Sequence, residues 1–395
     1  AFAWGPAGLL AAVAVPTAAA AMLLPSDRFV DLWGQPSFLT GEFKLNVLVA
    51  LGAMLVTALV MSPLISGRGL VRLSAAQVTW VRRATSLTAA LTFFGYLSWL
   101  LFGLARGITP AMILEVVTGG SSLIHDFKDF YLAPVTGVTT WTQLGVVLGP
   151  LALVRQKACG MSPRAIVGGL VVASALRALL FSERLALIEV IASTGVVWLV
   201  LRPSTPKPLA GVARYLVSVA CAWAALILAF SAFEFNRSWA TFYANYYDGG
   251  LLDFGAQRLL GYYATALNNS ALQSAQGDSA GDTSFILSGD LWGLMPGIDG
   301  GASDDFYNSL ATLSNPEFNN VSGLGVPLNV LGTAGGVLFL AGSVAFAAVA
   351  GLLARRGSVP WLLVYSTSAI GLLEVSRLLH FGGSRYTIAL IWIGA

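Results

Sequence analysis

The sequence is poor in charged residues and in the side chains that many soluble enzymes use for chemistry. Of its 395 residues, 10% are charged, 2 are His and 2 are Cys. Soluble domains carry about 25% charged residues, so this composition argues against a water-soluble protein. Cys159 falls in a connection and Cys221 in an apolar run. The sequence therefore predicts neither a disulfide framework nor a Cys/His metal site.

Motifs of soluble enzymes and of nucleic-acid binding are also missing. There is no Walker loop, no GxSxG and no basic patch. The acidic stretch "PGIDGGASDD" lacks the DxDxDG spacing of a calcium loop. We predict no metal, no cofactor and no nucleic-acid partner.

Long apolar runs dominate what is present. Hydrophobic residues make up 56% of the chain, and the mean hydropathy is +0.75. About 20 apolar residues cross a bilayer as a helix. We therefore predict an all-α polytopic membrane protein with about ten spans, the first a true helix and not a signal peptide because no basic segment precedes it. The expected spans are 5–24, 45–65, 86–104, 137–154, 164–181, 185–201, 214–233, 326–353, 360–379 and 386 onward.

Basic residues are segregated along this pattern. The connections 66–83, 155–164, 202–214 and 355–358 contain Arg and Lys but no Asp or Glu. All four fall on one side of a ten-span arrangement, which the positive-inside rule assigns to the cytoplasm together with both termini. The chain is thus expected to divide into seven spans (1–233), a large outer loop (234–325) and three further spans (326–395).

The outer loop is acidic and rich in aromatic residues. It contains ten acidic residues against Arg237 and Arg258. Its first half has helical spacing and predicts amphipathic helices near the membrane surface. Its second half is rich in Gly, Asp, Asn and Ser and predicts ordered turns over the mouth of the bundle.

Several ionisable residues are expected near the outer ends of the spans. Because charge is costly at membrane depth, such residues are functional candidates. Arginine is also the side chain best suited to bidentate phosphate recognition. The group comprises Arg177, Glu183, Arg184, Glu189, Glu374, Arg377, His380 and Arg385, with Arg237 and Arg258 contributed by the outer loop.

Purely structural roles are the alternatives. Arg177 and Glu189 could neutralise each other across a helical hairpin. Glu374 and Arg377, three residues apart, share one helix face and could form a structural pair. Arg258 could extend its charged end to water.

Four stretches resemble bacterial oligosaccharide repeat-unit polymerases of the Wzy-type O-antigen polymerase group. They are "RALLFSERLALIEV", "FNRSWATFY", "QRLLGYYATALNNSA" and "NNVSGLGVPLNVLG", between about residues 177 and 332. The resemblance implies a GT-C-like inverting glycosyltransferase of the bacterial cytoplasmic membrane, whose active site faces the periplasm or exterior. It also implies undecaprenyl-diphosphate-linked glycans as donor and acceptor, membrane lipid around the chain, and a chain-length regulator as a candidate partner.

Under this hypothesis the arginines hold the lipid diphosphates and stabilise the charge on the leaving group. The expected diphosphate ligands are Arg177, Arg184, Arg237, Arg258, Arg377 and Arg385. A base must also accept the proton of the attacking hydroxyl. We favour Glu183 for that role, followed by Glu374 and His380, and assign Glu189 a structural or orienting role.

Two other functions remain open from the sequence. A ligase that transfers finished chains to a different acceptor would share the architecture. A transporter would place its site near the midplane on broken helices, often with inverted repeats. The charges here fall near the outer ends of the spans and the sequence shows no repeat, which disfavours transport.

Overall fold

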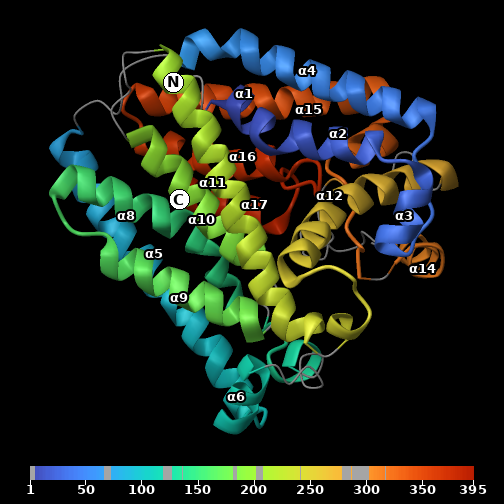
Figure 1. Ribbon diagram of the computed structural model, residues 1–395. Coiled ribbons are helices and arrows are strands. Elements are labelled where there is room, and N and C mark those ends of the chain that lie inside the picture. Colours follow the sequence, from blue (N-terminus) through green and yellow to red (C-terminus); the bar gives the residue numbers. More distant parts are fainter. Residues whose placement is uncertain are drawn as a thin grey trace.

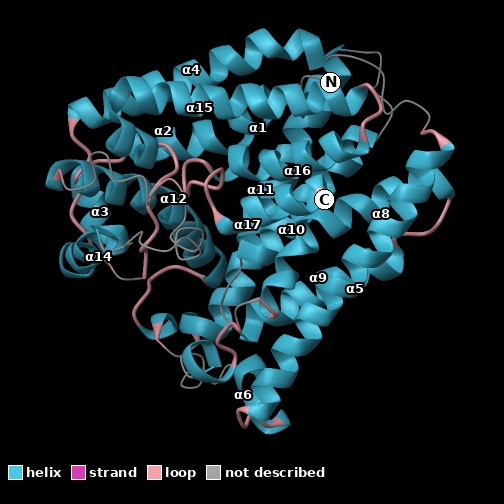
Figure 2. Cartoon of the chain, turned by 180° about the vertical axis from the view of Figure 1, so that it is seen from behind, coloured by secondary structure: helices cyan, strands magenta, loops and turns pink. Residues whose placement is uncertain are grey.

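The computed structural model is helical throughout the residues that it describes, and Figure 2 shows helices and loops but no strand in this part of the chain. The structure describes residues 5–65, 73–118, 127–135, 137–180, 185–201, 208–240, 242–277, 286, 302–315 and 317–395. Figure 1 shows that the helices form one body, with α3 and α14 at one side of it and α6 at its lower tip.

The helices follow one another with short connections in much of the described chain. Those before residue 160 are α1 (Pro6–Leu9), η2 (Leu10–Ala14), α2 (Val15–Leu23), α3 (Ser26–Trp33), α4 (Gly41–Ile65), α5 (Ala75–Ala105), α6 (Pro110–Thr118), η4 (Phe127–Tyr131), η5 (Thr139–Leu144) and α8 (Gly145–Cys159). Those after it are α9 (Arg164–Leu180), α10 (Leu185–Leu201), α11 (Pro208–Glu234), η6 (Phe235–Trp239), η7 (Tyr243–Asn245), α12 (Leu251–Gln276), α14 (Ala302–Leu313), α15 (Gly325–Arg355), α16 (Val359–Glu374) and α17 (Ser384–Gly394).

Five helical stretches are long and apolar enough to cross a membrane. They are Pro6–Leu23, Gly41–Ser62, Ala75–Ala105, Gly211–Glu234 and Gly325–Arg355. The other expected spans are helical too but shorter: α9 and α10 have 17 residues each, α16 has 16, α8 has 15 and α17 has 11. The described structure is therefore that of a helical membrane protein with five candidate spans.

The outer faces of the long helices are apolar and exposed. On α4, Leu45 and Val60 are more than half exposed, and on α11 the same is true of Leu216, Val217 and Leu228. Soluble monomers rarely expose contiguous apolar surface of this extent. A helix satisfies its own backbone hydrogen bonds, so such a surface is compatible with lipid. These faces indicate a membrane-embedded protein.

The ends of five helices pack together at one end of the bundle. A small apolar cluster joins Val81 of α5, Val154 of α8, Val197 of α10, Ala354 of α15 and Val359 of α16. The start of α5 is also tied to the α15–α16 turn, where Gln77 Nε2 donates to the Gly357 carbonyl at 3.0 Å. The helix ends next to all four basic connections that are expected on one side of the membrane thus lie together.

Helix α12 differs from the expected amphipathic surface helices. Its second half is buried on every side from Tyr263 to Gln273. Ala264, Leu267 and Ala271 belong to the main apolar core, together with residues of α2, α4, α15 and α16. The prediction of interfacial helices is wrong for this half because aromatic spacing reports helix formation but not what covers the helix.

Buried amides connect α12 to the start of α15. Asn269 Nδ2 donates to the carbonyls of Phe318 and Asn320 at 2.7 and 2.9 Å. Asn329 Nδ2 donates to the Ser270 carbonyl at 2.8 Å. Two of the stretches that carry the family resemblance therefore pack against each other.

The helix α15 is interrupted near its start. Gly332 has φ +69° and ψ 171°, a backbone conformation that favours glycine. The interruption separates a short first segment, held by Asn329 against α12, from the long apolar segment that follows. The N-terminal end of α15 is thereby fixed to α12.

Candidate functional site

Ionisable side chains from α10, α17 and the α16–α17 connection meet at Glu189. The Glu189 side chain on α10 is 2% exposed, and its Oε2 lies 3.2 Å from Nη1 of Arg385. Its Oε1 lies 3.7 Å from Nδ1 of His380. A buried carboxylate requires compensation by a partner. Glu189 therefore forms an ion pair with Arg385 of the last helical hairpin, has the His380 ring beside it, and lies within electrostatic range of Arg177.

Glu374 and Arg377 form the pair expected from their spacing. Arg377 Nε donates to Glu374 Oε2 at 2.6 Å, and both residues are buried. On its other oxygen, Oε1, Glu374 accepts from the hydroxyl of Tyr263 on α12 at 3.5 Å. The helical run of α16 ends at Glu374, and Ser376 hydrogen bonds Thr17 of α2 at 2.6 Å. The position of Arg377 is thus fixed from three elements.

Arg177 lies in the last turn of α9 and faces η5. Its Nη1 donates to Thr142 Oγ1 at 2.5 Å. One turn earlier on α9, Ser174 and Tyr96 of α5 share a hydrogen bond of 2.9 Å. Arg177 and Glu189 lie within electrostatic range of each other. The arginine is therefore part of the same charged region, and a hydroxyl is one of its direct contacts.

Three arginines, two carboxylates and one histidine gather in this region. They are Arg177, Arg377, Arg385, Glu189, Glu374 and His380. We call these six residues the arginine site.

Three atoms of the arginine site are buried without a hydrogen-bond partner among the described residues. They are Arg377 Nη2, His380 Nε2 and Glu189 Oε1. Buried polar atoms are almost always hydrogen-bonded, so unmet ones require an explanation. One is an obligate donor, one is an acceptor, and imidazole nitrogen serves as either. A ligand that offers both acceptor and donor groups would satisfy all three.

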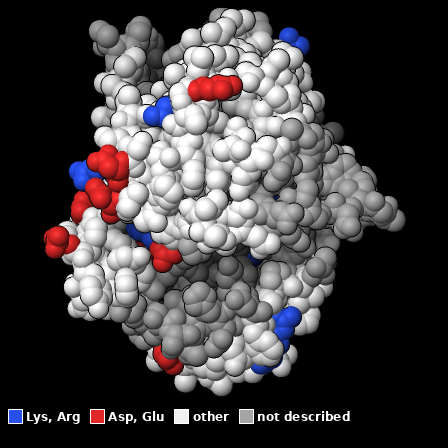
Figure 3. All heavy atoms as spheres, turned by 90° about the vertical axis from the view of Figure 1, so that its right-hand side faces the viewer, with Lys and Arg blue, Asp and Glu red and all other residues white. Residues whose placement is uncertain are grey.

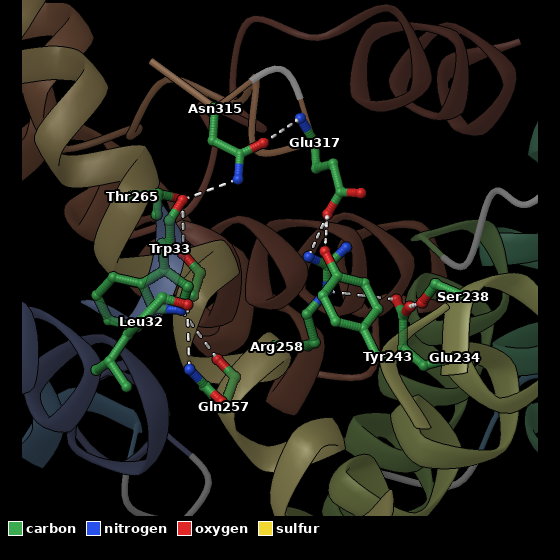
Figure 4. A network of polar contacts seen from close by, with 11 residues as sticks. Leu32, Trp33, Glu234, Ser238, Tyr243, Gln257, Arg258, Thr265, Asn315 and Glu317 are labelled. Atoms are coloured by element: carbon green, nitrogen blue, oxygen red, sulfur yellow. Dashed lines mark hydrogen bonds and ion pairs between the residues drawn. The ribbon is translucent and has the colours of Figure 1, made fainter. Parts of the chain in front are cut away.

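Arg258 lies in a separate site, shown in Figure 4. It comes from α12 and is 5% exposed, forming ion pairs with Glu317 and, at 3.9 Å from Nε, with Glu234 at the end of α11. Its guanidinium carbon lies 4.6 Å from the ring centre of Phe318. Burial lowers the pKa of Arg258, but Glu234 and Glu317 outweigh it and raise the pKa above its ordinary value. The side chain is enclosed, and does not extend to water as the snorkelling alternative requires.

Three predicted site residues fall where the structure gives no side-chain description. Glu183 and Arg184 lie outside the described residues, and the side chain of Arg237 does also. Their assigned roles stay predictions. Five of the remaining candidates meet around Glu189 at the arginine site. They are Arg177, Arg377, Arg385, Glu374 and His380.

Sequence reasoning missed two contacts of the arginine site. Tyr263 was one of many aromatic residues in the outer loop, and Thr142 one of four threonines in "TGVTTWT". Nothing in composition or spacing distinguishes either residue. Only the packing of α12 against α16, and of η5 against α9, brings them to Glu374 and Arg177.

Within the described residues, no group of three or more His, Cys, Asp or Glu side chains could hold a metal ion. Comparison with protein-family models, curated proteins and solved structures found no match.

Proposed function

We propose that this protein polymerises undecaprenyl-diphosphate-linked oligosaccharide repeat units by inverting glycosyl transfer at the outer leaflet of a bacterial cytoplasmic membrane. The observation that carries the proposal is the arginine site. Three arginines lie together there, and Arg377 Nη2 and His380 Nε2 are buried nitrogens with no hydrogen-bond partner among the described residues. Guanidinium groups and nitrogens of this kind suit an anionic group of a membrane-embedded substrate. A lipid diphosphate is such a group.

The proposal assigns a role to each part of the arginine site. An acceptor hydroxyl attacks the anomeric carbon of the donor sugar, and the bond from that carbon to the diphosphate oxygen breaks. The electron pair leaves with the diphosphate, whose growing charge the guanidinium groups stabilise. Attack from the face opposite the leaving group inverts the anomeric carbon, and the hydroxyl proton passes to a base.

The candidate bases differ in their contacts. Both oxygens of Glu374 are engaged, by Arg377 and Tyr263. His380 Nε2 is buried with no partner among the described residues. Of the described candidates, His380 therefore has the nitrogen best placed to accept a proton, with Glu189 beside its Nδ1. Glu183 keeps its place as the candidate at the outer turn.

The remaining architecture belongs to the same proposal. Ten spans in a GT-C-like arrangement would place the short helices α8, α9, α10, α16 and α17 across the membrane. The basic connections would lie in the cytoplasm, and the outer loop would face the periplasm or exterior.

The test is transfer by purified protein supplied with lipid-linked repeat unit. Arg177→Ala, Arg377→Ala and Arg385→Ala are each expected to abolish polymer formation while the protein remains folded in the membrane. Lys at the same positions should rescue poorly, because an ammonium cannot replace the bidentate guanidinium. Arg28→Ala is the matched control, since Arg28 forms an exposed pair with Asp31 at 3.6 Å. It should leave polymerisation unchanged.

The products distinguish the functions. Polymerisation gives a ladder of chain lengths from repeat units alone, whereas a ligase gives product only after a different acceptor is added. Full-length polymer from all three Ala variants would refute the assignment of the arginine site to diphosphate.

A further inference from the structure

A group of aromatic side chains lies between the end of α11 and the start of α12. We call it the aromatic platform, and its members are Trp239, Phe242, Tyr243, Tyr246, Tyr247 and Phe254. Phe254 is 3% exposed and packs against Tyr243 at 4.7 Å, Trp239 at 5.3 Å and Tyr247 at 5.4 Å between ring centres. Through these contacts, the aromatic rings around the buried side chain of Phe254 form a continuous surface.

The outermost rings of the aromatic platform are open to the surroundings. Phe242 is 55% exposed and Tyr246 is 76% exposed. Their ring centres lie 5.1 Å apart and the ring planes are inclined by only 37°. The two rings therefore lie partly against each other, and their exposure leaves the rest of their π-surface available to a ligand.

The aromatic platform packs against a buried arginine. The guanidinium carbon of Arg258 lies 5.8 Å from the ring centre of Phe254 and 5.9 Å from the ring centre of Tyr243. Arg258 is itself bound to Glu234 and Glu317. The inner rings of the platform, Tyr243 and Phe254, are thus anchored to α11, to α12 and to the segment before α15.

Polar acceptors border the platform. Tyr247 donates its hydroxyl hydrogen to Asp253 at 2.6 Å, and the Tyr243 hydroxyl lies 3.5 Å from Glu317. A sugar ring matches this arrangement, because its C–H face can lie on an aromatic face while its hydroxyl groups meet carboxylates and phenols.

Charge selects among the possible occupants. Residues 234–325 contain ten acidic residues and two basic ones. Figure 3 views the side of the molecule on which α3 and α14 lie, and it shows Asp and Glu atoms gathered along one edge of this face. Anionic lipid headgroups and acidic sugars would be repelled by such a loop, whereas a neutral sugar would not.

One helix connects the platform to the arginine site. Phe254 and Tyr263 both belong to α12, and Tyr263 contacts Glu374 beside Arg377. Nine residues of helix separate them, or about 14 Å along the axis. A short glycan attached to a diphosphate at Arg377 would extend over such a distance.

We propose that the aromatic platform binds a neutral sugar ring of the glycan whose lipid diphosphate occupies the arginine site. The inference rests on the proposed function and adds to it a substrate class, glycans with neutral sugars a few units from the diphosphate. Phe242 and Tyr246 provide the stacking faces, and Asp253 and Glu317 provide acceptors at the edge.

The experiment measures glycan binding without lipid or diphosphate. The probe is the neutral oligosaccharide fraction released by mild acid from the surface polysaccharide of the producing cells, fluorescently labelled, and its acidic fraction serves as a comparison. The Phe242→Ala, Tyr246→Ala double variant should bind the neutral probe about tenfold more weakly than the parent protein. The acidic fraction should bind weakly to both proteins.

Phe130→Ala is the matched control. Phe130 is 62% exposed and packs edge-to-face against Tyr131 at 5.1 Å between ring centres, but it lies in η4, outside the platform. Its variant should bind the neutral probe as the parent protein does. Equal affinity of the parent and the platform variant, or no binding of the neutral probe to the parent, would overturn the inference. If the platform variant instead loses only lipid-dependent thermal stability, the platform is an interfacial anchor of the membrane and the inference is wrong.

The two proposals fail separately. Platform variants that lose glycan binding, combined with Arg377→Ala protein that still polymerises, would leave the platform standing and remove the diphosphate assignment. Inactive arginine variants, combined with unchanged glycan binding by platform variants, would remove the platform alone.

Discussion

Replacing Arg258 by Met separates the two roles that this residue could have. The ion pair with Glu234 is buried, since Glu234 is 0% exposed, and the nitrogen-to-oxygen distance is 3.9 Å. Removing one partner of a buried pair costs about 3–5 kcal/mol. Ser238 still donates a hydrogen bond to Glu234, which places the expected cost toward the lower end of this range. Glu317 is 38% exposed on its side chain, so its share of the loss is small, about 0–1 kcal/mol.

The cost should appear as a lower melting temperature in detergent. Each kcal/mol lowers Tm by about 2–4 °C for a chain of a few hundred residues, so Arg258→Met should lower Tm by about 10 °C. Adding Glu234→Gln should restore part of the loss, because a neutral amide tolerates burial better than an unpaired carboxylate. The control Arg28→Met removes an exposed pair and should change the free energy of unfolding by less than about 0.5 kcal/mol.

Thermal unfolding followed by tryptophan fluorescence provides the measurement, together with polymer formation per folded molecule. Specific activity is expected to persist in the folded fraction of Arg258→Met. If Tm changes by less than about 2 °C and activity is lost, Arg258 binds substrate and the structural reasoning is wrong.

Two other predictions concern topology and packing. In a background without Cys159 and Cys221, an impermeant maleimide should label Asn245→Cys in intact cells and Ser162→Cys only after lysis; labelling of both in intact cells would contradict the orientation. Gly261→Ala should cost about 1–3 kcal/mol, because a Cβ there would lie 2.5 Å from Nε1 of Trp33 and 2.9 Å from the ring of Phe318. Gly52→Ala is the control, because a Cβ at Gly52 would meet nothing within 4 Å. In thermal unfolding it should be neutral or stabilise the protein by about 0.5–1 kcal/mol. Equal effects of the two substitutions would show that the close packing at Gly261 does not contribute to stability.

Local features of this protein could be predicted from its sequence. Apolar runs predicted helices at each of the expected positions, and composition alone predicted a membrane protein. The pair of Glu374 and Arg377 followed from a spacing of three residues, since a helix brings such positions to one face. These features depend on neighbours along the chain, which are visible in the sequence.

The tertiary structure decided which distant residues meet. Glu189 pairs with Arg385, 196 positions away, although Arg177 was the nearer arginine across the expected hairpin. Arg258 is enclosed by Glu234 and Glu317, and the second half of α12 is buried although its residues resemble a surface helix. Helical periodicity tells which residues share a face, but the element that covers that face depends on how all the helices pack. For this reason the sequence determined the helices and the kinds of charged residue at the candidate site, whereas packing alone determined their partners.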